Sequence, residues 1–278
     1  MSLTEEFFES LVSDINSQRI ELPTLPEVAL KIRDTVAKDD VSAKEVSDVI
    51  SSDAAMSARL LQVVNSPLYR GAQLIDDVNR AVARLGFTTT RDLVTGLAMR
   101  QMFQATTEAT DTRLRNIWEH STQVASISQM LAKTFTRLKP DQAMLGGLIH
   151  DIGALPILVR AEDSDELMND LDLLDNMIRE LHPRVGTLIL DSWHFPDELI
   201  AVVAEHENLS YDSGEKITYV DVIQVANIQS HLGTDHYLAN IDLNDVPSCV
   251  KLGLAGDVDV VDIDGYEVVD EMNQILSA

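Results

Sequence analysis

Apolar residues recur every three or four positions along most of the chain, which is the spacing of one face of an α-helix. Alternating patterns of the kind that a half-buried strand requires are few. Helix boundaries are marked as well. Pro26 suits the first turn of a helix, Ser42 and Glu45 form a capping box, and Pro67 ends a helix that begins near Asp53. The pattern predicts an all-α protein built from many consecutive helices.

A polar stretch at 104–112 interrupts the helical pattern. It predicts a boundary between an N-terminal helical unit over 20–105 and a second helical unit over 113–235. The remaining tail, 236–278, contains Gly, Asp and short Val-rich pieces before a short helix that we expect from Tyr266 to Leu276. The chain therefore divides, on its pattern alone, into two helical units and a tail.

Composition narrows the class of protein. The 278 residues are 45% hydrophobic, which is enough for a core. The chain has 21 basic and 46 acidic side chains, a net charge of −25, which argues against a nucleic-acid binder. No uncharged apolar run approaches the ~20 residues of a membrane span, and the acidic N-terminus lacks the features of a signal peptide. With Cys249 as its one cysteine, the sequence is typical of a soluble cytoplasmic protein that does not bind membranes.

Charge is distributed unevenly along the chain. Residues 1–140 carry 16 Lys/Arg and 18 Asp/Glu, whereas residues 141–278 carry 5 and 28, a net of −23. This half either presents a well-solvated acidic face or creates a field that attracts cations and repels anionic polymers. His231 and His236 lie in a polar stretch of this half, and we interpret them as surface histidines.

Two ionisable residues stand on helical stripes that are otherwise apolar. Asp151 follows Met144 and Leu148 at helical spacing. A carboxylate on an apolar face is costly unless it is paired or bound to a metal. His120 shares its stripe with apolar residues such as Val124, which places it on the buried side of its helix.

Three more histidines, His150, His182 and His206, lie beside apolar helical runs. Each one, taken singly, fits a hydrogen-bonded core residue better than a metal ligand. Together with His120 and Asp151 they offer nitrogen and oxygen ligands from separate helices, suited to Fe, Mn, Zn or Mg. Such a site is what a metal-dependent phosphohydrolase needs to clamp a phosphate and activate water.

The order of these five residues resembles the HD superfamily of metal-dependent phosphohydrolases. The segments LPTLPEVALKI, SSDAAMSARLLQVVNSPLY and NRAVARLGFTTTRDL are similar to the HDOD family, a divergent HD branch found mainly in bacterial signalling and regulatory proteins. The resemblance covers about residues 20–230. It implies an HDOD domain over 20–235, with an N-terminal helical bundle packed on an HD-like helical unit.

The resemblance also implies a set of metal ligands. The motif positions of active HD enzymes fall on His120, His150, Asp151 and His182 here, and Asp151 is the candidate catalytic residue. The family's paired histidines appear as Glu205–His206, so His206 joins the ligand set and Glu205 is a further candidate.

The distal aspartate of HD enzymes is the position where this sequence departs most from the pattern. Asn227 stands there, and a neutral amide is a weaker ligand than a carboxylate. Asp221 lies six residues earlier, which is about 600° around a helix and off the original face. Asn227 and Asp221 therefore remain additional candidates rather than members of the core set.

Two functions follow. The first is an HDOD-family signalling or regulatory module that acts through signalling-protein partners and keeps part of an HD metal site. The departures at Glu205 and Asn227 favour it. The alternative is a metal-dependent phosphohydrolase or phosphodiesterase acting on a small phosphorylated molecule or nucleotide, with Asp151 bridging metals or orienting water. DNA binding by the N-terminal unit is the least favoured, because residues 20–105 show no basic surplus.

Overall fold

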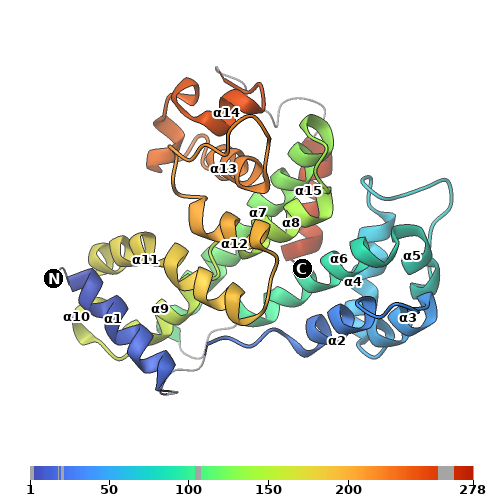
Figure 1. The fold of residues 1–278 in the computed structure, drawn as a ribbon, viewed down its shortest axis with the longest axis horizontal. Helices are drawn as coiled ribbons and strands as arrows, with labels where there is room; N and C mark the ends of the chain where they lie inside the picture. The colour runs from blue at the N-terminus through green and yellow to red at the C-terminus, as the bar shows by residue number, and fades with distance from the viewer. Residues whose placement is uncertain (1–2, 18, 20–21, 104–107, 256–265, 278) are drawn as a thin grey trace.

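The computed structural model describes residues 3–17, 19, 22–103, 108–255 and 266–277 (Figure 1). These residues form α-helices joined by short loops and 3₁₀ turns, and no strand occurs among them. The all-α prediction is confirmed.

The first half of the chain is a succession of short helices whose ends follow the sequence signals. Ser42 accepts a hydrogen bond from the backbone of Glu45 while the Glu45 side chain accepts one from the backbone of Ser42, which completes the predicted capping box. The elements are α1 (Leu3–Asn16), α2 (Glu27–Val36), α3 (Ala43–Ser51), α4 (Ala54–Asn65), α5 (Val78–Leu85), α6 (Phe87–Met99) and the 3₁₀ turn η1 (Arg100–Phe103).

The second half contains the longest helices. The elements are α7 (Glu108–Phe135), α8 (Pro140–Ile149), α9 (Ala154–Ala161), α10 (Asp165–Asn169), α11 (Leu171–Ser192), α12 (Asp197–Glu205) and α13 (Tyr219–Ser230), followed by η2 (Tyr237–Asn240), η3 (Leu243–Asp245), α14 (Pro247–Lys251) and α15 (Tyr266–Ser277). Helix α7 begins inside the polar stretch 104–112, so the described part of that stretch is helical. Helix α15 begins where the sequence predicts the last helix to begin.

Two clusters of buried apolar side chains hold these helices together. The larger runs from α1 to α12 and includes Met272 and Leu276 of α15. The smaller joins α7 and α13 to the tail, through residues such as Leu238 and Cys249. Both units and the tail therefore share cores, and α15 returns to pack on α7 and α4.

Polar contacts also tie the N-terminal segment to the second half. The indole of Trp193, just after α11, donates to the carbonyl of Pro23 at 2.9 Å, and Arg33 donates to the carbonyl of Trp193 at 2.5 Å. Tyr69 donates its phenolic proton to Asp141 at the start of α8 and accepts a bond from Gln129 of α7. These contacts fix the two halves against each other.

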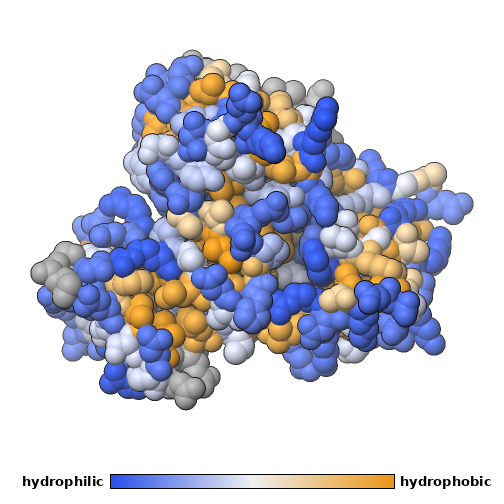
Figure 2. All heavy atoms as spheres, viewed as in Figure 1, coloured by the Kyte–Doolittle hydropathy of each residue, from blue (hydrophilic) through white to orange (hydrophobic). Residues whose placement is uncertain are grey.

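One stretch in the described part of the chain, Pro140–Ala161, is long and apolar enough to cross a membrane. Of its most apolar window, 83% is buried inside the molecule, so these residues belong to the protein core. Figure 2 shows hydrophilic residues over most of one face, with apolar side chains gathered where α1 and α9 lie. Leu3 and Val159 are among the exposed apolar residues of these helices.

Candidate metal centre

The five residues of the predicted set come from four helices and their ends. His120 lies in the middle of α7, and His150 and Asp151 directly follow α8. His182 lies within α11, and His206 caps the C-terminus of α12. The structure brings the four histidines together around the carboxylate of Asp151, whereas the sequence places these residues only on separate helices.

Glycines allow the helices that carry these residues to pack closely enough for the histidines to reach Asp151. A Cβ atom on Gly147 of α8 would lie 2.6 Å from the Cα of Ala125 on α7. A Cβ on Gly153, at the start of α9, would lie 2.0 Å from the carbonyl oxygen of His182. Backbones meet at both places, so α7 is held against α8 and Asp151 is held against α11.

Asp151 lies between two pairs of histidines. Its Oδ2 is 3.8 Å from Nε2 of His120 and 3.3 Å from Nε2 of His150. Its Oδ1 is 3.3 Å from Nε2 of His182 and 3.3 Å from Nε2 of His206. Each carboxylate oxygen therefore faces one pair, and within each group the potential ligand atoms lie within 4.8 Å of one another.

Backbone carbonyls fix the tautomers of three of these rings. His150 Nδ1 lies 2.7 Å from the carbonyl oxygen of Gly147, His182 Nδ1 lies 2.9 Å from that of Ile178, and His206 Nδ1 lies 3.0 Å from that of Val203. A carbonyl only accepts, so each Nδ1 carries a proton, and in the neutral form of each ring Nε2 presents a lone pair. This is the arrangement by which proteins orient metal-ligating histidines.

The contact between His182 and His206 tests whether a metal ion fits the site. Nε2 of His182 lies 2.9 Å from Nε2 of His206, and in the neutral forms of the two rings both nitrogens present lone pairs. Two lone pairs at this distance repel each other unless a cation, either a proton or a metal ion, is bound there. The donor set of four imidazoles and one carboxylate suits Zn, Mn or Fe better than Mg, which prefers oxygen ligands.

The electrostatics of the cluster agree with this reading. Burial alone raises the pKa of Asp151, but the surrounding histidines outweigh it and hold that pKa well below its usual range. Burial lowers the pKa of His120 and His182, and lowers that of His150 to about 3. His206 is the exception, because Asp151 outweighs the effect of burial and raises its pKa. Three neutral imidazoles thus surround an ionised carboxylate, the protonation states that metal ligands require.

The cluster opens into a cavity of about 650 Å³. His120 and Asp151 are partly exposed to it, whereas His150 and His206 are fully buried. Arg113 and Arg179 also line the cavity. A small molecule that enters it reaches one edge of the cluster while the deeper histidines stay covered.

Two residues at this cavity were not predicted as part of the site. The ring of His231 stacks on that of His120 with centroids 4.9 Å apart, and the ring of His236 stacks on His231 at 3.7 Å. Both were interpreted as surface histidines, yet both line the cavity. The sequence spacing could have indicated the position of His231, because it follows Asn227 by four residues and so lies on the same helical face.

The three additional candidate ligands have different surroundings. Asn227 is buried, lines the cavity and lies beside His120, and its Oδ1 has no hydrogen-bond partner among the described residues. Asp221 lies elsewhere, because α13 begins at Tyr219 and Asp221 bonds to Thr218 and Lys251. The Glu205 carboxylate accepts a bond from Asn208 and does not line the cavity.

Comparison with known proteins places the chain among helical proteins of one family. The HDOD domain model matches residues 22–209. A protein from Shewanella amazonensis SB2B, provisionally described as a metal-dependent phosphohydrolase, is 31% identical with a TM-score of 0.84, covering 99% of this chain and 100% of its own. No curated protein matches.

More distant solved structures share the fold. An HDOD domain protein of unknown function from Geobacter sulfurreducens is 22% identical with a TM-score of 0.66, covering 96% of each chain. A signal transduction protein, also provisionally described, from Marinobacter aquaeolei VT8 is 20% identical with a TM-score of 0.66, covering 99% of this chain and 66% of its own.

Proposed function

Because the chain belongs to the HDOD family, whose HD relatives are metal-dependent phosphohydrolases, we propose that it binds divalent metal and hydrolyses a small phosphorylated molecule. One observation carries the proposal: a single carboxylate, that of Asp151, faces the Nε2 atoms of two histidine pairs, and backbone carbonyls hold the Nδ1 atoms of the three buried rings. The 31% identical relative from Shewanella amazonensis, provisionally described as such an enzyme, supports the same class.

The residues divide between two ligand groups. His120 and His150 would hold metal with one oxygen of Asp151, and His182 and His206 with the other. When bound, a divalent metal polarises a phosphate oxygen and lowers the pKa of water. Asp151 is the residue common to both groups, which gives it the bridging role in the proposal.

The chain itself supplies the means to attract and orient a phosphate. Arg113 and Arg179 line the cavity beside the cluster, in a half of the protein with a net charge of −23. Arg113 pairs with Asp175 and Arg179 donates to Asn176, so both guanidinium groups are held at the cavity wall. A guanidinium forms bidentate bonds with phosphate. The cavity of about 650 Å³ is of the size that small-molecule sites have.

Metal content tests the proposal first. We expect untagged protein, purified without added metal, to contain close to one or two equivalents of transition metal, and H150A to lose it. The control is H194N, because His194 is exposed, lies outside the cluster and has a φ of 55° that asparagine tolerates. Absence of metal from wild-type protein, even after incubation with Mn²⁺, Fe²⁺ or Zn²⁺, would refute the metal site.

Turnover tests the enzymatic part. The metal-loaded protein should hydrolyse p-nitrophenyl phosphate or bis(p-nitrophenyl) phosphate, and D151N should reduce the rate by at least about a hundredfold. H194N should leave it unchanged. A protein that is fully loaded with metal and inert towards both substrates would not be a general phosphohydrolase.

A second candidate function is the regulatory module, in which the cluster stabilises a helical scaffold that binds signalling proteins in the cytoplasm. The specific observation in its favour is Asn227, a neutral residue beside His120 where HD enzymes have an aspartate. N227D separates the two. An enzyme with a weakened site should gain metal affinity and turnover from N227D, whereas a scaffold should gain neither. N79D, which adds the same charge at an exposed position on α5, is the control.

A further inference from the structure

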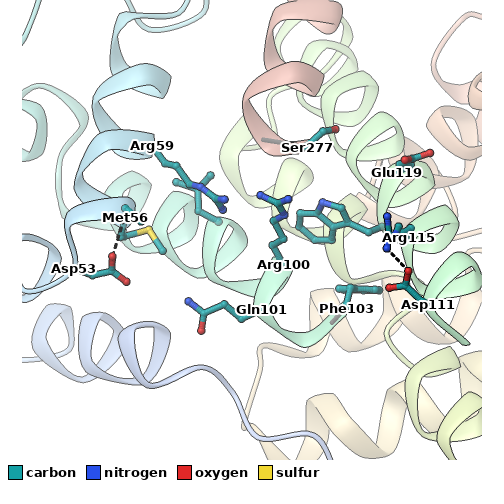
Figure 3. Close-up of a pocket in the computed structure, with 13 residues that line it drawn as sticks. Asp53, Met56, Arg59, Arg100, Gln101, Phe103, Asp111, Arg115, Glu119 and Ser277 are labelled. Carbon is teal, nitrogen blue, oxygen red and sulfur yellow. Dashed lines mark hydrogen bonds and ion pairs between the residues drawn. The ribbon is translucent and has the colours of Figure 1, made fainter. Parts of the chain in front are cut away.

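A second cavity of about 650 Å³ lies outside the candidate metal centre. Its walls come from α4, the end of α6 with η1, the first half of α7 and the last residues of α15 (Figure 3). Helix α15 closes one side, where Ser277 lies 3.2 Å from the hydroxyl of Thr122. The cavity therefore lies where the N-terminal helices, α7 and the C-terminal helix meet.

Positive charge is concentrated on one side of this cavity. Figure 3 shows Arg59, from α4, and Arg100, from η1, with their guanidinium ends pointing into the same space. Burial lowers the pKa of Arg59, and the charge of Arg100 adds to this effect while that of Asp53 opposes it. Arg115, which pairs with Asp111, lines the cavity as well. The lining also includes the carboxylates of Asp53 and Glu119, so the attraction for a compact anion is local to the space between the two converging guanidinium groups.

Aromatic and apolar side chains form another wall. Phe103 and Trp118 are both buried, with ring centroids 5.1 Å apart, and Met56 and Leu97 line the same cavity. The indole N–H of Trp118 is buried without a hydrogen-bond acceptor among the described residues. A buried donor of this kind is costly, and an acceptor on a ligand would relieve that cost. This wall suits a flat ring better than a bare ion.

Hydrogen-bonding groups complete the lining. One oxygen of Asp53 caps α4 by accepting from the backbone of Met56, and its second carboxylate oxygen accepts no hydrogen bond from the described residues. The Gln101 amide points to the same side in Figure 3. Asp53 and Gln101 lie on the Met56 side of the cavity in Figure 3 and add a carboxylate and an amide that can hydrogen-bond to a ligand.

We propose that this cavity is a binding site for a mononucleotide, with the phosphate between Arg59 and Arg100 and the base against Phe103 and Trp118. The size of the cavity, its converging guanidinium groups, its aromatic wall and its polar side chains each suit that ligand class.

This site is separate from the candidate metal centre. Helix α7 contributes Arg115 and Trp118 to the nucleotide cavity, and Arg113 and His120 to the cavity of the cluster. Residues two apart on a helix differ by about 200°, so the two cavities lie on opposite faces of α7. Nucleotide binding here does not depend on the metal or on hydrolysis.

Isothermal titration of the metal-free full-length protein with adenosine and guanosine 5′-monophosphates tests the site. At least one nucleotide should bind, and R59Q and R100Q should each weaken it about tenfold or more. R80Q, which removes an exposed arginine on α5, should bind as wild type does. D151N should also bind normally, because the cluster is not involved. Binding lost in D151N and retained in R59Q would overturn the proposal.

Two further measurements test where the base binds, and neither depends on the folding of the arginine variants. Inorganic phosphate and ribose 5-phosphate should bind at least about tenfold more weakly than the nucleotide. Equal binding would overturn the assignment of the base to the aromatic wall. In otherwise wild-type protein, nucleotide should change the intrinsic fluorescence, and W118F should abolish that change. A change that persists in W118F, or no binding of either nucleotide, would also overturn the proposal.

Discussion

Gly146 and Gly147 are neighbours on α8 and face different surroundings. A Cβ atom on Gly147 would lie 2.6 Å from Cα and 2.7 Å from N of Ala125 on α7. A Cβ atom on Gly146 would lie 3.2 Å from the Cδ1 methyl of Ile223 and 3.4 Å from a methyl of Leu199. The end of a side chain can shift, but the backbone of a packed helix cannot shift alone. We expect G147A to push α8 away from α7 and G146A to keep the native packing.

The two variants together isolate the cost of that displacement. Bringing the 2.6 Å contact of Gly147 to 3.4 Å, an ordinary contact distance, requires about 0.8 Å of movement. Overpacking of this kind costs about 1–3 kcal/mol. Both variants gain the same helix propensity, about 1 kcal/mol for Gly to Ala, so this contribution cancels in the comparison. G147A should therefore be about 1–3 kcal/mol less stable than G146A.

Denaturant unfolding of the metal-free proteins measures this difference directly. A second readout follows from the position of the contact, because α7 carries His120 and α8 leads into His150, whose Nε2 atoms lie 3.2 Å apart. Separating the helices should weaken metal binding by about tenfold or more in G147A and leave it unchanged in G146A. Equal stability of the two variants, within about 0.5 kcal/mol, would show that the close approach of α7 and α8 is not as described.

Three other predictions concern stability and pH. Y69F removes one of the hydrogen bonds to the buried Asp141 and should lower the free energy of unfolding by about 1–3 kcal/mol, measured by urea denaturation. K251M removes a charge that pairs with the buried Asp221 and should cost a similar amount in the same assay, with an exposed lysine variant as control. Burial lowers the pKa of His150 to about 3. As the pH falls, His150 becomes protonated in the unfolded chain near pH 6.5 but in the folded protein only near pH 3. The stability of the metal-free protein should therefore fall between these two pH values, which melting curves recorded at several pH values would show.

The sequence predicts the helices and the buried side of each one because both depend on local spacing. Asp151 is the best example, since its place on an apolar stripe predicts a buried carboxylate that needs partners. Which histidines face each other depends on contacts between distant segments. His120 meets His150 across 30 positions and His182 meets His206 across 24, through helix packing that spacing alone does not encode.

Two further residues illustrate the same limit. His236 lies in a polar stretch, the local signature of a surface residue, yet the turn after α13 stacks it on His231. Helical spacing sets Asp221 off the face of Asn227, and in the structure its carboxylate caps the first turn of α13 and pairs with Lys251 from the tail. Local pattern identifies a helix start here, but the contact with the tail is non-local.

The metal centre and the stability of the fold are linked through the second histidine pair. Carbonyls at Ile178 and Val203 fix the tautomers of His182 and His206, which leaves two lone pairs 2.9 Å apart in a buried site. In the metal-free protein a proton on His206 offsets this repulsion, since Asp151 raises the pKa of that ring. A bound metal takes the place of the proton and binds only the folded chain, so it should raise the melting temperature in proportion to the logarithm of its free concentration. H206A removes one lone pair of the contact and should lose most of that increase. A melting temperature that does not respond to Zn²⁺, Mn²⁺ or Fe²⁺ would mean that a shared proton, rather than a metal, stabilises the pair.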